Sequence, residues 1–179
     1  MTSINFSELQ IQKLSAIHDT SRFDCDDKDI NEFLQQDALM WQQRKLAITH
    51  LVIYNEQIVG FYCTSADSIK LKLQERKEEN NLDKKRITEV PAVKIGRLGV
   101  HKDHQRQGLG TFILQRAIGH ILSTSEAIGV RFVTVDAYPE MQKWYEKRGF
   151  KINAHADYKP KENISMRLCL YNPAPQTKQ

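Results

Sequence analysis

Apolar side chains recur along this chain at two spacings, and these spacings predict a mixture of helices and strands. After an acidic turn at residues 23–27, apolar positions return every three or four residues up to about Arg44, as on the buried face of a helix. Residues 109–122 carry a second, broader stripe of the same period. A third, shorter helix is predicted after Pro139, and Gly149 is of the residue type that commonly ends a helix. The apolar positions of the first two stripes are Ile30, Phe33, Leu34, Ala38 and Trp41, then Leu109, Phe112, Ile113, Ala117, Ile118 and Ile121.

Short runs of apolar and β-branched residues predict the strands. They lie at residues 9–16, 50–54, 58–63, 94–100, 131–138, 150–153 and 164–170. The second and third runs flank turn residues 55–57 and predict a hairpin. Residues 68–90 are rich in charge and predict a partly helical excursion or a loop that ends at Pro91. The resulting order of strands and helices is that of a mixed α/β domain.

Length and composition limit the architecture further. The 179 residues suit one domain, which we place at residues 1–170, followed by a disordered tail at 171–179. No apolar run approaches the length of a membrane span, and the N-terminus lacks the order of a signal peptide, so we expect a cytoplasmic protein. The cysteines have no metal-ligand spacing and are expected to be reduced thiols; they are Cys25, Cys63 and Cys169.

The stretch with the clearest chemistry is residues 97–111, which reads as the end of a strand, a basic loop with glycines and the start of a helix. This order directs successive main-chain N–H groups toward one point at the positive end of the helix dipole, which suits a diphosphate. Gly108 and Gly110 let the main chain approach such a ligand closely. Lys102 and Arg106 add positive charge, and basic residues outnumber acidic ones in the surrounding segment. A ligand with several phosphate groups explains this excess, as does a solvated basic surface.

The loop resembles the acetyl-CoA loop of the GNAT (GCN5-related) N-acetyltransferases, whose pattern is Gln/Arg-x-x-Gly-x-Gly/Ala. It lacks the Gly-Lys-Ser/Thr of a Walker loop and the spacing of a dinucleotide fingerprint. The order of elements resembles that family over nearly the whole chain, which implies a GNAT fold: a central, mostly antiparallel mixed sheet with a splayed strand pair, flanked by helices. The resemblance also implies acetyl-CoA as co-substrate. The residues that would bind it are Leu98, Gly99 and Val100 along the pantetheine arm, and Gln105, Arg106, Gln107, Gly108, Leu109, Gly110 and Thr111 in the loop.

The strand before the loop contains two glycines, Gly96 and Gly99. Glycine weakens a strand, so the pair favours a bulge or a close approach of a ligand over an ordinary buried strand. In GNAT enzymes this strand splays from its neighbour and leaves main-chain groups free for the pantetheine arm.

Residues 144–150 resemble the GNAT segment Phe-Tyr-x-x-x-Gly-Phe. In that family the tyrosine commonly donates a proton to the departing CoA thiolate, and the resemblance gives this role of general acid to Tyr145. A phenol with a pKa near 10 suits the task. The alternative is a core aromatic side chain on an amphipathic helix.

The sequence offers less for a general base. Asp136 is a candidate, with a structural hydrogen-bonding role as its alternative, and Glu89 is a weaker one. A substantial fraction of an α-amine with a pKa near 8 is already neutral at cellular pH, so such a substrate needs no strong protein base. The histidines match no metal-ligand spacing and no metal is predicted; they include His101, His104, His120 and His155.

Several segments resemble the acetyltransferase toxins of bacterial type II toxin–antitoxin systems. Asp26 stands where those toxins have glycine, and Gly99 where they have alanine. Such toxins acetylate the α-amine of aminoacyl-tRNA and stop translation, and a paired antitoxin, often with a ribbon-helix-helix domain, neutralises them. The matching segments are Phe23-Asp24-Cys25 with Ile30-Asn31-Glu32-Phe33-Leu34, Pro91 with Ile95-Gly96-Arg97-Leu98, Gly129-Val130-Arg131 with Val135-Asp136-Ala137, and Ser165-Met166.

The resemblance therefore implies an N-acetyltransferase that acts on aminoacyl-tRNA. Two other functions stay open: acetylation of a small-molecule amine or a protein N-terminus, and non-catalytic binding of acyl-CoA. The charged segment 68–90 either helps to hold tRNA phosphates or is a solvated loop. Many GNAT proteins pair through their sheets, so a homodimer is expected. The candidate substrate-binding residues are Arg97, Lys84, Lys85 and Arg86, supported by Arg44 and Lys45.

Overall fold

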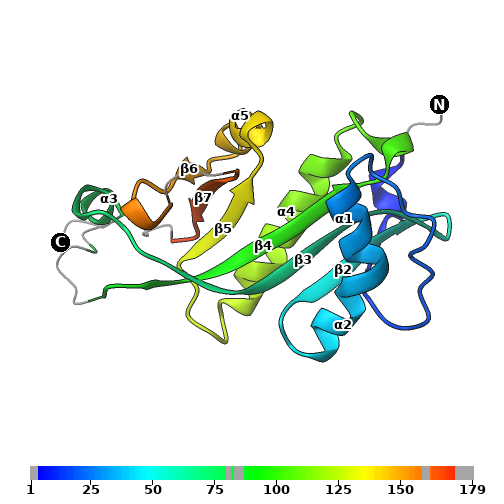
Figure 1. Ribbon diagram of the computed structural model, residues 1–179, viewed down its shortest axis with the longest axis horizontal. Helices are drawn as coiled ribbons and strands as arrows, with labels where there is room; N and C mark the ends of the chain where they lie inside the picture. Colours follow the sequence, from blue (N-terminus) through cyan, green and yellow to red (C-terminus); the bar gives the residue numbers. More distant parts are fainter. Residues whose placement is uncertain (1–3, 80–81, 83–86, 159–161, 172–179) are drawn as a thin grey trace, which may run out of the picture. The chain divides into compact units, whose positions relative to one another are not determined.

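The computed structural model describes residues 4–79, 82, 87–158 and 162–171 (Figure 1). Its contacts divide the chain into two compact units. The first, unit 1, holds Met1–Ser65 and Ile95–His120, and the second, unit 2, holds Ala66–Lys94 and Ile121–Gln179. The strands form one seven-stranded sheet in the order β1-β2-β3-β4-β5-β7-β6. The single domain at residues 1–170 stays a prediction, and all of the expected tail except Tyr171 lies outside the described residues.

Unit 1 begins with antiparallel strands. Strand β1 (Gln10–Lys13) pairs with β2 (Ile48–Tyr54), and β2 pairs with β3 (Gln57–Ile69). The predicted hairpin is confirmed: Asn55 and Glu56 both have positive φ, which gives the tight turn whose twist matches that of the strands. Strand β3 continues six residues past the predicted end at Cys63, so the charged excursion starts later than expected.

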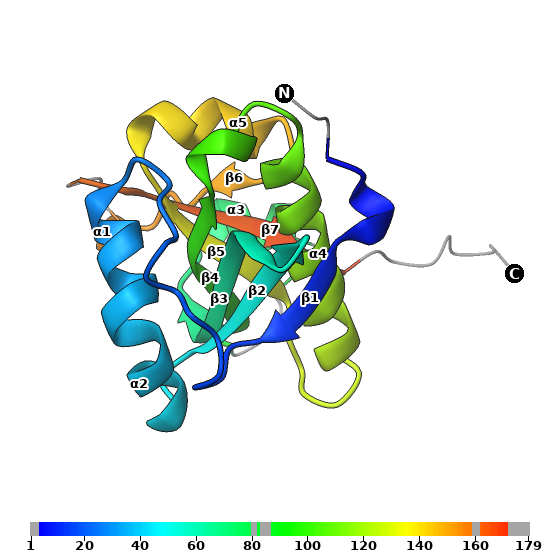
Figure 2. The same ribbon diagram turned by 90° about the vertical axis from the view of Figure 1, so that its right-hand side faces the viewer.

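Helices cover both faces of the unit 1 strands (Figure 2). Helices α1 (Lys28–Glu32) and α2 (Ala38–Gln43) lie on one face, and α4 (Leu109–Thr124) lies on the other. The apolar cluster beneath α1 and α2 combines residues from the helices, from β2 and β3 and from the segment before α1. It comprises Leu14, Phe23, Cys25, Phe33, Leu34, Ala38, Leu51, Phe61 and Cys63.

The helix predicted up to Arg44 is interrupted. The Asp27 side chain caps its start by accepting from the Ile30 N–H at 3.0 Å. Between α1 and α2 lies a π-helical segment, Phe33–Asp37, whose wider turn shifts the later side chains out of the expected register. Trp41, predicted on the buried face, is accordingly 37% exposed, although its ring still meets that of Phe33 edge-on.

Unit 2 is built around β5 (Phe132–Ala137), which pairs antiparallel with β7 (Ile164–Cys169). Strand β6 (Lys151–Ile152) pairs with β7, also antiparallel. A 3-10 turn that starts at Pro139 leads into α5 (Gln142–Glu146), as predicted. Gly149 has φ +87° and follows this helix, which confirms its predicted place at the helix end.

A buried ion cluster ties α3 (Leu73–Glu78) to β7 within unit 2. The guanidinium of Arg167, only 2% exposed, lies 2.6 Å from a Glu75 carboxylate oxygen and 3.4 Å from one of Glu79. Glu75 also accepts from the N–H groups of Lys72 and Ala154. The first part of the charged segment 68–90 therefore contains a helix that these contacts hold in place. The sequence alone does not predict which residues pair.

Strand β4 (Val90–Val100) starts four residues earlier than predicted and contains Pro91. The proline precedes the first register pair with β5, Ala92–Phe132, so its missing N–H costs no ladder bond there. This parallel register ends at the pair Lys94–Thr134, although β4 continues to Val100 and β5 to Ala137. A register that ends this early is the feature expected of a splayed strand pair.

Candidate functional site

The loop before α4 presents main-chain N–H groups that have no acceptor among the described residues. A 3-10 turn, Lys102–His104, leads into it, Arg106 has φ +60° and Gly108 has φ +86°. Within the described part of the chain, no acceptor takes the N–H groups of residues 106–110. Because unpaired amides at a helix N-terminus carry the positive end of the dipole, this loop suits an anionic ligand.

The neighbouring end of β4 continues past its register with β5. The sheet order places β3 and β5 beside β4, and the β5 register stops at Lys94. One edge of residues 95–100, which includes the predicted Leu98, Gly99 and Val100, therefore has no strand partner among the described residues. Such an edge can hydrogen-bond an extended ligand that carries amide groups.

Gly99 has a second explanation, which the sequence did not reveal. A Cβ at this position would lie 2.7 Å from Cε1 of Phe61 and 3.0 Å from Cγ2 of Ile30. The glycine is thus required by the packing of the apolar cluster beneath α1. Gly96 is different, because its Cβ would make only ordinary contact with Sγ of Cys63, at 3.5 Å.

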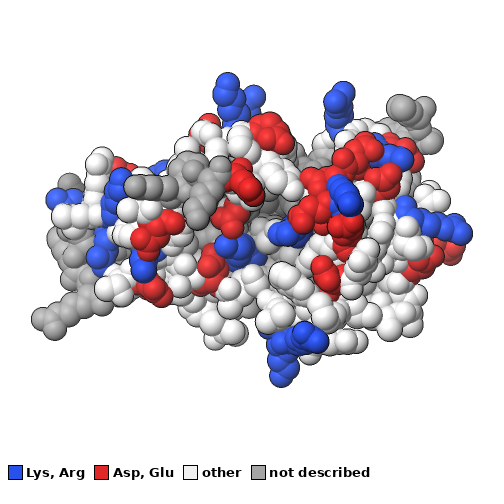
Figure 3. Space-filling model, viewed as in Figure 1, with Lys and Arg blue, Asp and Glu red and all other residues white. Residues whose placement is uncertain are grey.

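The positive charge expected around the loop is largely compensated. Lys94 pairs with Asp136 at 3.0 Å, Arg97 with Asp29 at 3.1 Å and Lys102 with Asp24 at 2.8 Å. The basic residues of segment 94–116 also include Arg106 and Arg116, which form no ion pair with a described residue. Figure 3 shows basic and acidic side chains interspersed over the face that it draws. The main chain, more than a basic surface, therefore makes this loop suitable for an anion.

Tyr145 lies in α5 of unit 2 and is nearly buried, with 9% of its surface exposed. Its ring meets those of Trp144 and Phe150 edge-on, at centroid distances of 4.8 and 5.3 Å. Burial raises the pKa of Tyr145 to about 12, and the charge of Arg148 lowers it only in part. The hydroxyl therefore keeps its proton at neutral pH, as a proton donor must.

The two candidate bases are held by other groups. Asp136 is exposed, and its Oδ2 accepts from Nζ of Lys94 at 3.0 Å. The pKa of Lys94 is raised in turn: burial lowers it, but the hydrogen bond and the charge of Asp136 outweigh burial. Glu89 accepts from the Ser68 hydroxyl at 3.1 Å.

The other predicted binding residues lie partly inside and partly outside the described residues. Lys84, Lys85 and Arg86 lie outside the described residues. Arg44 and Lys45 are exposed at the end of α2, and within the described chain neither forms an ion pair. No cluster of three or more metal-ligating side chains occurs among the described residues, and no helix among them is long and apolar enough to cross a membrane.

One aromatic cluster was missed by sequence reasoning. His50 stacks on Tyr62 at 5.0 Å and meets His120 edge-on at 4.6 Å, and the Tyr62 hydroxyl lies 3.3 Å from Nδ1 of His120. Burial is the main reason that the pKa of His50 falls to about 4, so His50 is neutral under physiological conditions. The residues belong to β2, β3 and α4, and the spacing within any one element gives no sign of the cluster.

Comparison with known proteins agrees with this geometry. The model of the acetyltransferase (GNAT) domain matches residues 47–152. The tRNA-acetylating toxin of Mycobacterium tuberculosis is 22% identical over 159 residues, which cover 89% of this chain and 90% of that protein.

Two solved structures have the same fold. AtaT complexed with acetyl-methionyl-tRNAfMet aligns with a TM-score of 0.75 at 23% identity, over 88% of this chain and 93% of that one. A tyrosine-to-phenylalanine mutant of the AtaT toxin, bound to the C-terminus of the antitoxin AtaR and acetyl-CoA, aligns with a TM-score of 0.72 at 21% identity, over 90% and 93% of the two chains. The predicted fold class and the likeness to acetyltransferase toxins are confirmed. Because the family model matches more than half of this chain, the chain belongs to the GNAT family of acetyltransferases.

Proposed function

We propose that this enzyme transfers the acetyl group of acetyl-CoA to the α-amine of aminoacyl-tRNA and thereby blocks translation. The acceptor half of this proposal rests on the tRNA-acetylating toxin that aligns over 89% of the chain. The donor half rests on the N–H groups of residues 106–110, which have no acceptor among the described residues.

Residues 105–111 would bind the diphosphate of coenzyme A through the main chain. Gly108, with φ +86°, turns the chain where a side chain would be strained and would stand in the way. The unpaired edge of β4 at residues 98–100 would take the amides of the pantetheine arm. Both segments lie in unit 1.

Tyr145 would be the general acid. The reaction forms a C–N bond to the amine and breaks the C–S bond of the thioester, so the leaving thiolate must gain a proton while the amine nitrogen loses one. The Tyr145 hydroxyl supplies the first proton, and the proton lost from nitrogen restores the phenol. With a pKa of about 12, the phenol holds its proton until negative charge develops on sulfur.

No protein base is needed for this acceptor. The α-amine has a pKa near 8, so a substantial fraction is neutral at cellular pH. The ion pair of Asp136 with Lys94 argues against Asp136 as the base. An α-amine is therefore a better match to this site than a lysine side chain, whose pKa near 10.4 would leave it charged.

The wider assembly follows from the same relatives. AtaT is bound to the antitoxin AtaR in a solved structure, and we propose a paired antitoxin for this chain too. Arg44 and Lys45 are free of ion pairs with described residues and are candidates to contact tRNA phosphates. A cytoplasmic location suits the acceptor, and the homodimer stays a prediction that sedimentation analysis would test.

The experiment is transfer of radiolabelled acetyl from acetyl-CoA to purified acceptors. We expect label on aminoacyl-tRNA and none on the same tRNA after its amino acid has been removed. Expression in bacteria should arrest growth in step with this activity. Label on small amines or on protein N-termini but not on charged tRNA would contradict the acceptor proposal. Binding of acetyl-CoA without transfer to any acceptor would leave a non-catalytic acyl-CoA module.

A further inference from the structure

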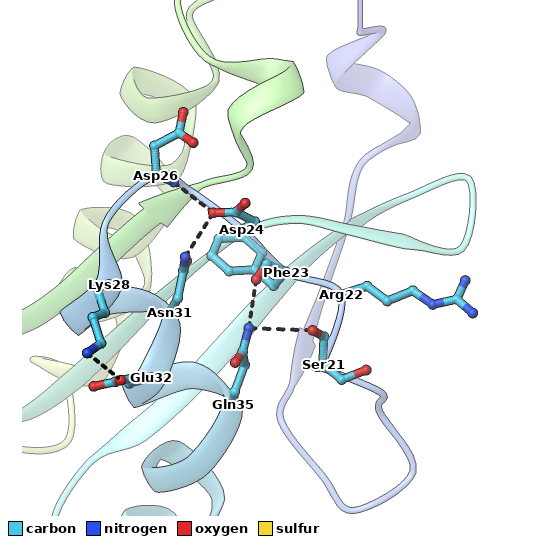
Figure 4. A pocket seen from close by; sticks show the side chains of 9 residues that line it. All are labelled: Ser21, Arg22, Phe23, Asp24, Asp26, Lys28, Asn31, Glu32 and Gln35. Carbon is cyan, nitrogen blue, oxygen red and sulfur yellow. Dashed lines mark hydrogen bonds and ion pairs between the residues drawn. The ribbon is translucent and has the colours of Figure 1, made fainter.

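The loop that carries the free amides is held by a segment far from it in the sequence. Asp24 and Asn31 on one side, and Lys102 and Gln105 on the other, form a set of contacts that we call the loop clamp. All four residues belong to unit 1. Figure 4 shows the N-terminal half of the clamp, where the Asn31 side chain points to Asp24.

Asp24 makes contact with the loop through both its side chain and its main chain. Oδ2 accepts from Nζ of Lys102 at 2.8 Å, and the Asp24 carbonyl accepts from the Lys102 N–H, also at 2.8 Å. Oδ1 accepts from Nδ2 of Asn31 at 2.9 Å and from the Asp26 N–H at 3.0 Å. The Lys102 ammonium, with these N–H donors, holds the pKa of Asp24 well below its usual range. Asp24 is therefore charged throughout the physiological range.

Asn31 fixes the segment from α1. Its Oδ1 accepts from the N–H of Cys25 at 3.0 Å and from the Cys25 thiol at 3.1 Å, while its Nδ2 donates to Asp24. Asp26, which follows, has φ +63°, a conformation that aspartate adopts more readily than most residues. The chain between Asp24 and α1 is thus held in one turn.

Gln105 completes the clamp at the first residue of the coenzyme loop. Its Nε2 donates to the Cys25 carbonyl at 2.9 Å and to the Val100 carbonyl at 3.2 Å. The side chain thus joins three places: the N-terminal segment, the end of β4 and the loop. It points back into the protein, and the free N–H groups start at the next residue.

We propose that the side chains of Asp24 and Gln105 position the amides of residues 106–110 in their binding orientation, although neither side chain touches the coenzyme. This inference rests on the proposed coenzyme site. A loop that is ordered before binding avoids the loss of conformational freedom on binding, so the clamp increases affinity. Plain electrostatics makes the opposite prediction for Asp24, because removal of a negative charge near an anion site should tighten binding.

The direction in which Asp24→Asn changes the affinity for acetyl-CoA therefore decides between the positioning role and simple charge repulsion. We expect the Kd and KM for acetyl-CoA to rise about threefold, a modest effect because the ion pair is exposed, with kcat unchanged. Gln105→Glu removes both Nε2 donors and sets a carboxylate against two carbonyl oxygens, so we expect Kd to rise about tenfold. Gln115→Glu adds the same charge at an exposed position of α4 and should leave Kd within about twofold.

Calorimetry with acetyl-CoA and steady-state kinetics measure these values, and urea unfolding checks that the variants are folded. Hydrogen exchange of the ligand-free protein adds a direct test, since Gln105→Glu should speed exchange of the amides of residues 106–110 more than Gln115→Glu does. Tighter binding in Asp24→Asn, or unchanged binding in Gln105→Glu, would overturn the clamp and leave the coenzyme site intact. Failure of the unaltered protein to bind acetyl-CoA would overturn the proposed site, and the clamp with it.

Discussion

The two units treat their charged and amide groups in opposite ways. In unit 2, Arg167 and its partners Glu75 and Glu79 are buried, their charges are paired with one another, and Glu75 also accepts from the Lys72 N–H. In unit 1, the Asp24–Lys102 pair is exposed, and the N–H groups of residues 106–110 have no acceptor among the described residues. A buried group of paired charges contributes to folding stability, whereas unpaired main-chain N–H groups beside exposed contacts are suited to bind a ligand. The comparison therefore separates the residues that should govern stability from those that should govern affinity.

The largest effect is expected from Tyr145→Phe. The change keeps the ring that packs against Trp144 and Phe150 but removes the hydroxyl. We expect kcat for acetyl transfer to fall about 10²- to 10⁴-fold, the usual value of general acid catalysis, while the Kd for acetyl-CoA stays the same. Rapid-quench or steady-state assays with charged tRNA measure the first and calorimetry the second. Unchanged turnover would remove Tyr145 from the mechanism.

The next largest effect is on stability, from Arg167→Met. The variant leaves Glu75 and Glu79 buried without their cation, which should lower the free energy of unfolding by about 3 kcal/mol. Lys151→Met, which removes an exposed cation from β6, should change it by less than about 0.5 kcal/mol. Urea unfolding measures both. Equal effects would show that the buried cluster does not anchor unit 2.

Gly99→Ala tests the packing of β4 against the apolar cluster beneath α1 and α2. The new Cβ would lie 2.7 Å from the buried Phe61 ring, so we expect a loss of about 1–3 kcal/mol in the free energy of unfolding. Gly96→Ala is the matched control in the same strand, because its Cβ has room. Thermal unfolding of the two variants measures the difference. A loss no larger for Gly99→Ala than for Gly96→Ala would refute the packing explanation.

The smallest effect is expected at Asp26, whose φ is +63°. Asp26→Gly should be neutral or stabilising by about 0.5 kcal/mol, since glycine adopts this conformation without strain. Asp26→Ala should be destabilising, because it keeps the Cβ and loses the polar side chain. If alanine proved at least as stable as glycine here, backbone strain at Asp26 would not govern which residues this position favours.

Features encoded in neighbouring residues were predictable from the sequence. The turn before α4 at Arg106 and Gly108, the hairpin turn at Asn55 and Glu56, and the helix end at Gly149 each depend on a few adjacent residues with particular backbone preferences. The prediction of one helix up to Arg44 was only partly right. The π-helical segment Phe33–Asp37 changes the register of the later side chains, and the apolar pattern gives no clear sign of it.

Contacts between distant residues could not be predicted in this way. Asp24 and Lys102 are 78 positions apart, and Glu75 and Arg167 are 92 apart, so no local pattern pairs them. For the same reason, the sequence shows an excess of basic residues around the loop but does not show that most of them have acidic partners. Likewise, Gly99 gave no sign that the Phe61 ring lies against it.

A crystal structure with acetyl-CoA tests the central claim most directly. We predict that oxygens of the coenzyme diphosphate lie within about 3 Å of main-chain nitrogens among residues 106–110, with the Gln105 side chain still bound to the Cys25 and Val100 carbonyls. A diphosphate bound elsewhere, or held by side chains while these amides stay without a partner, would contradict the account.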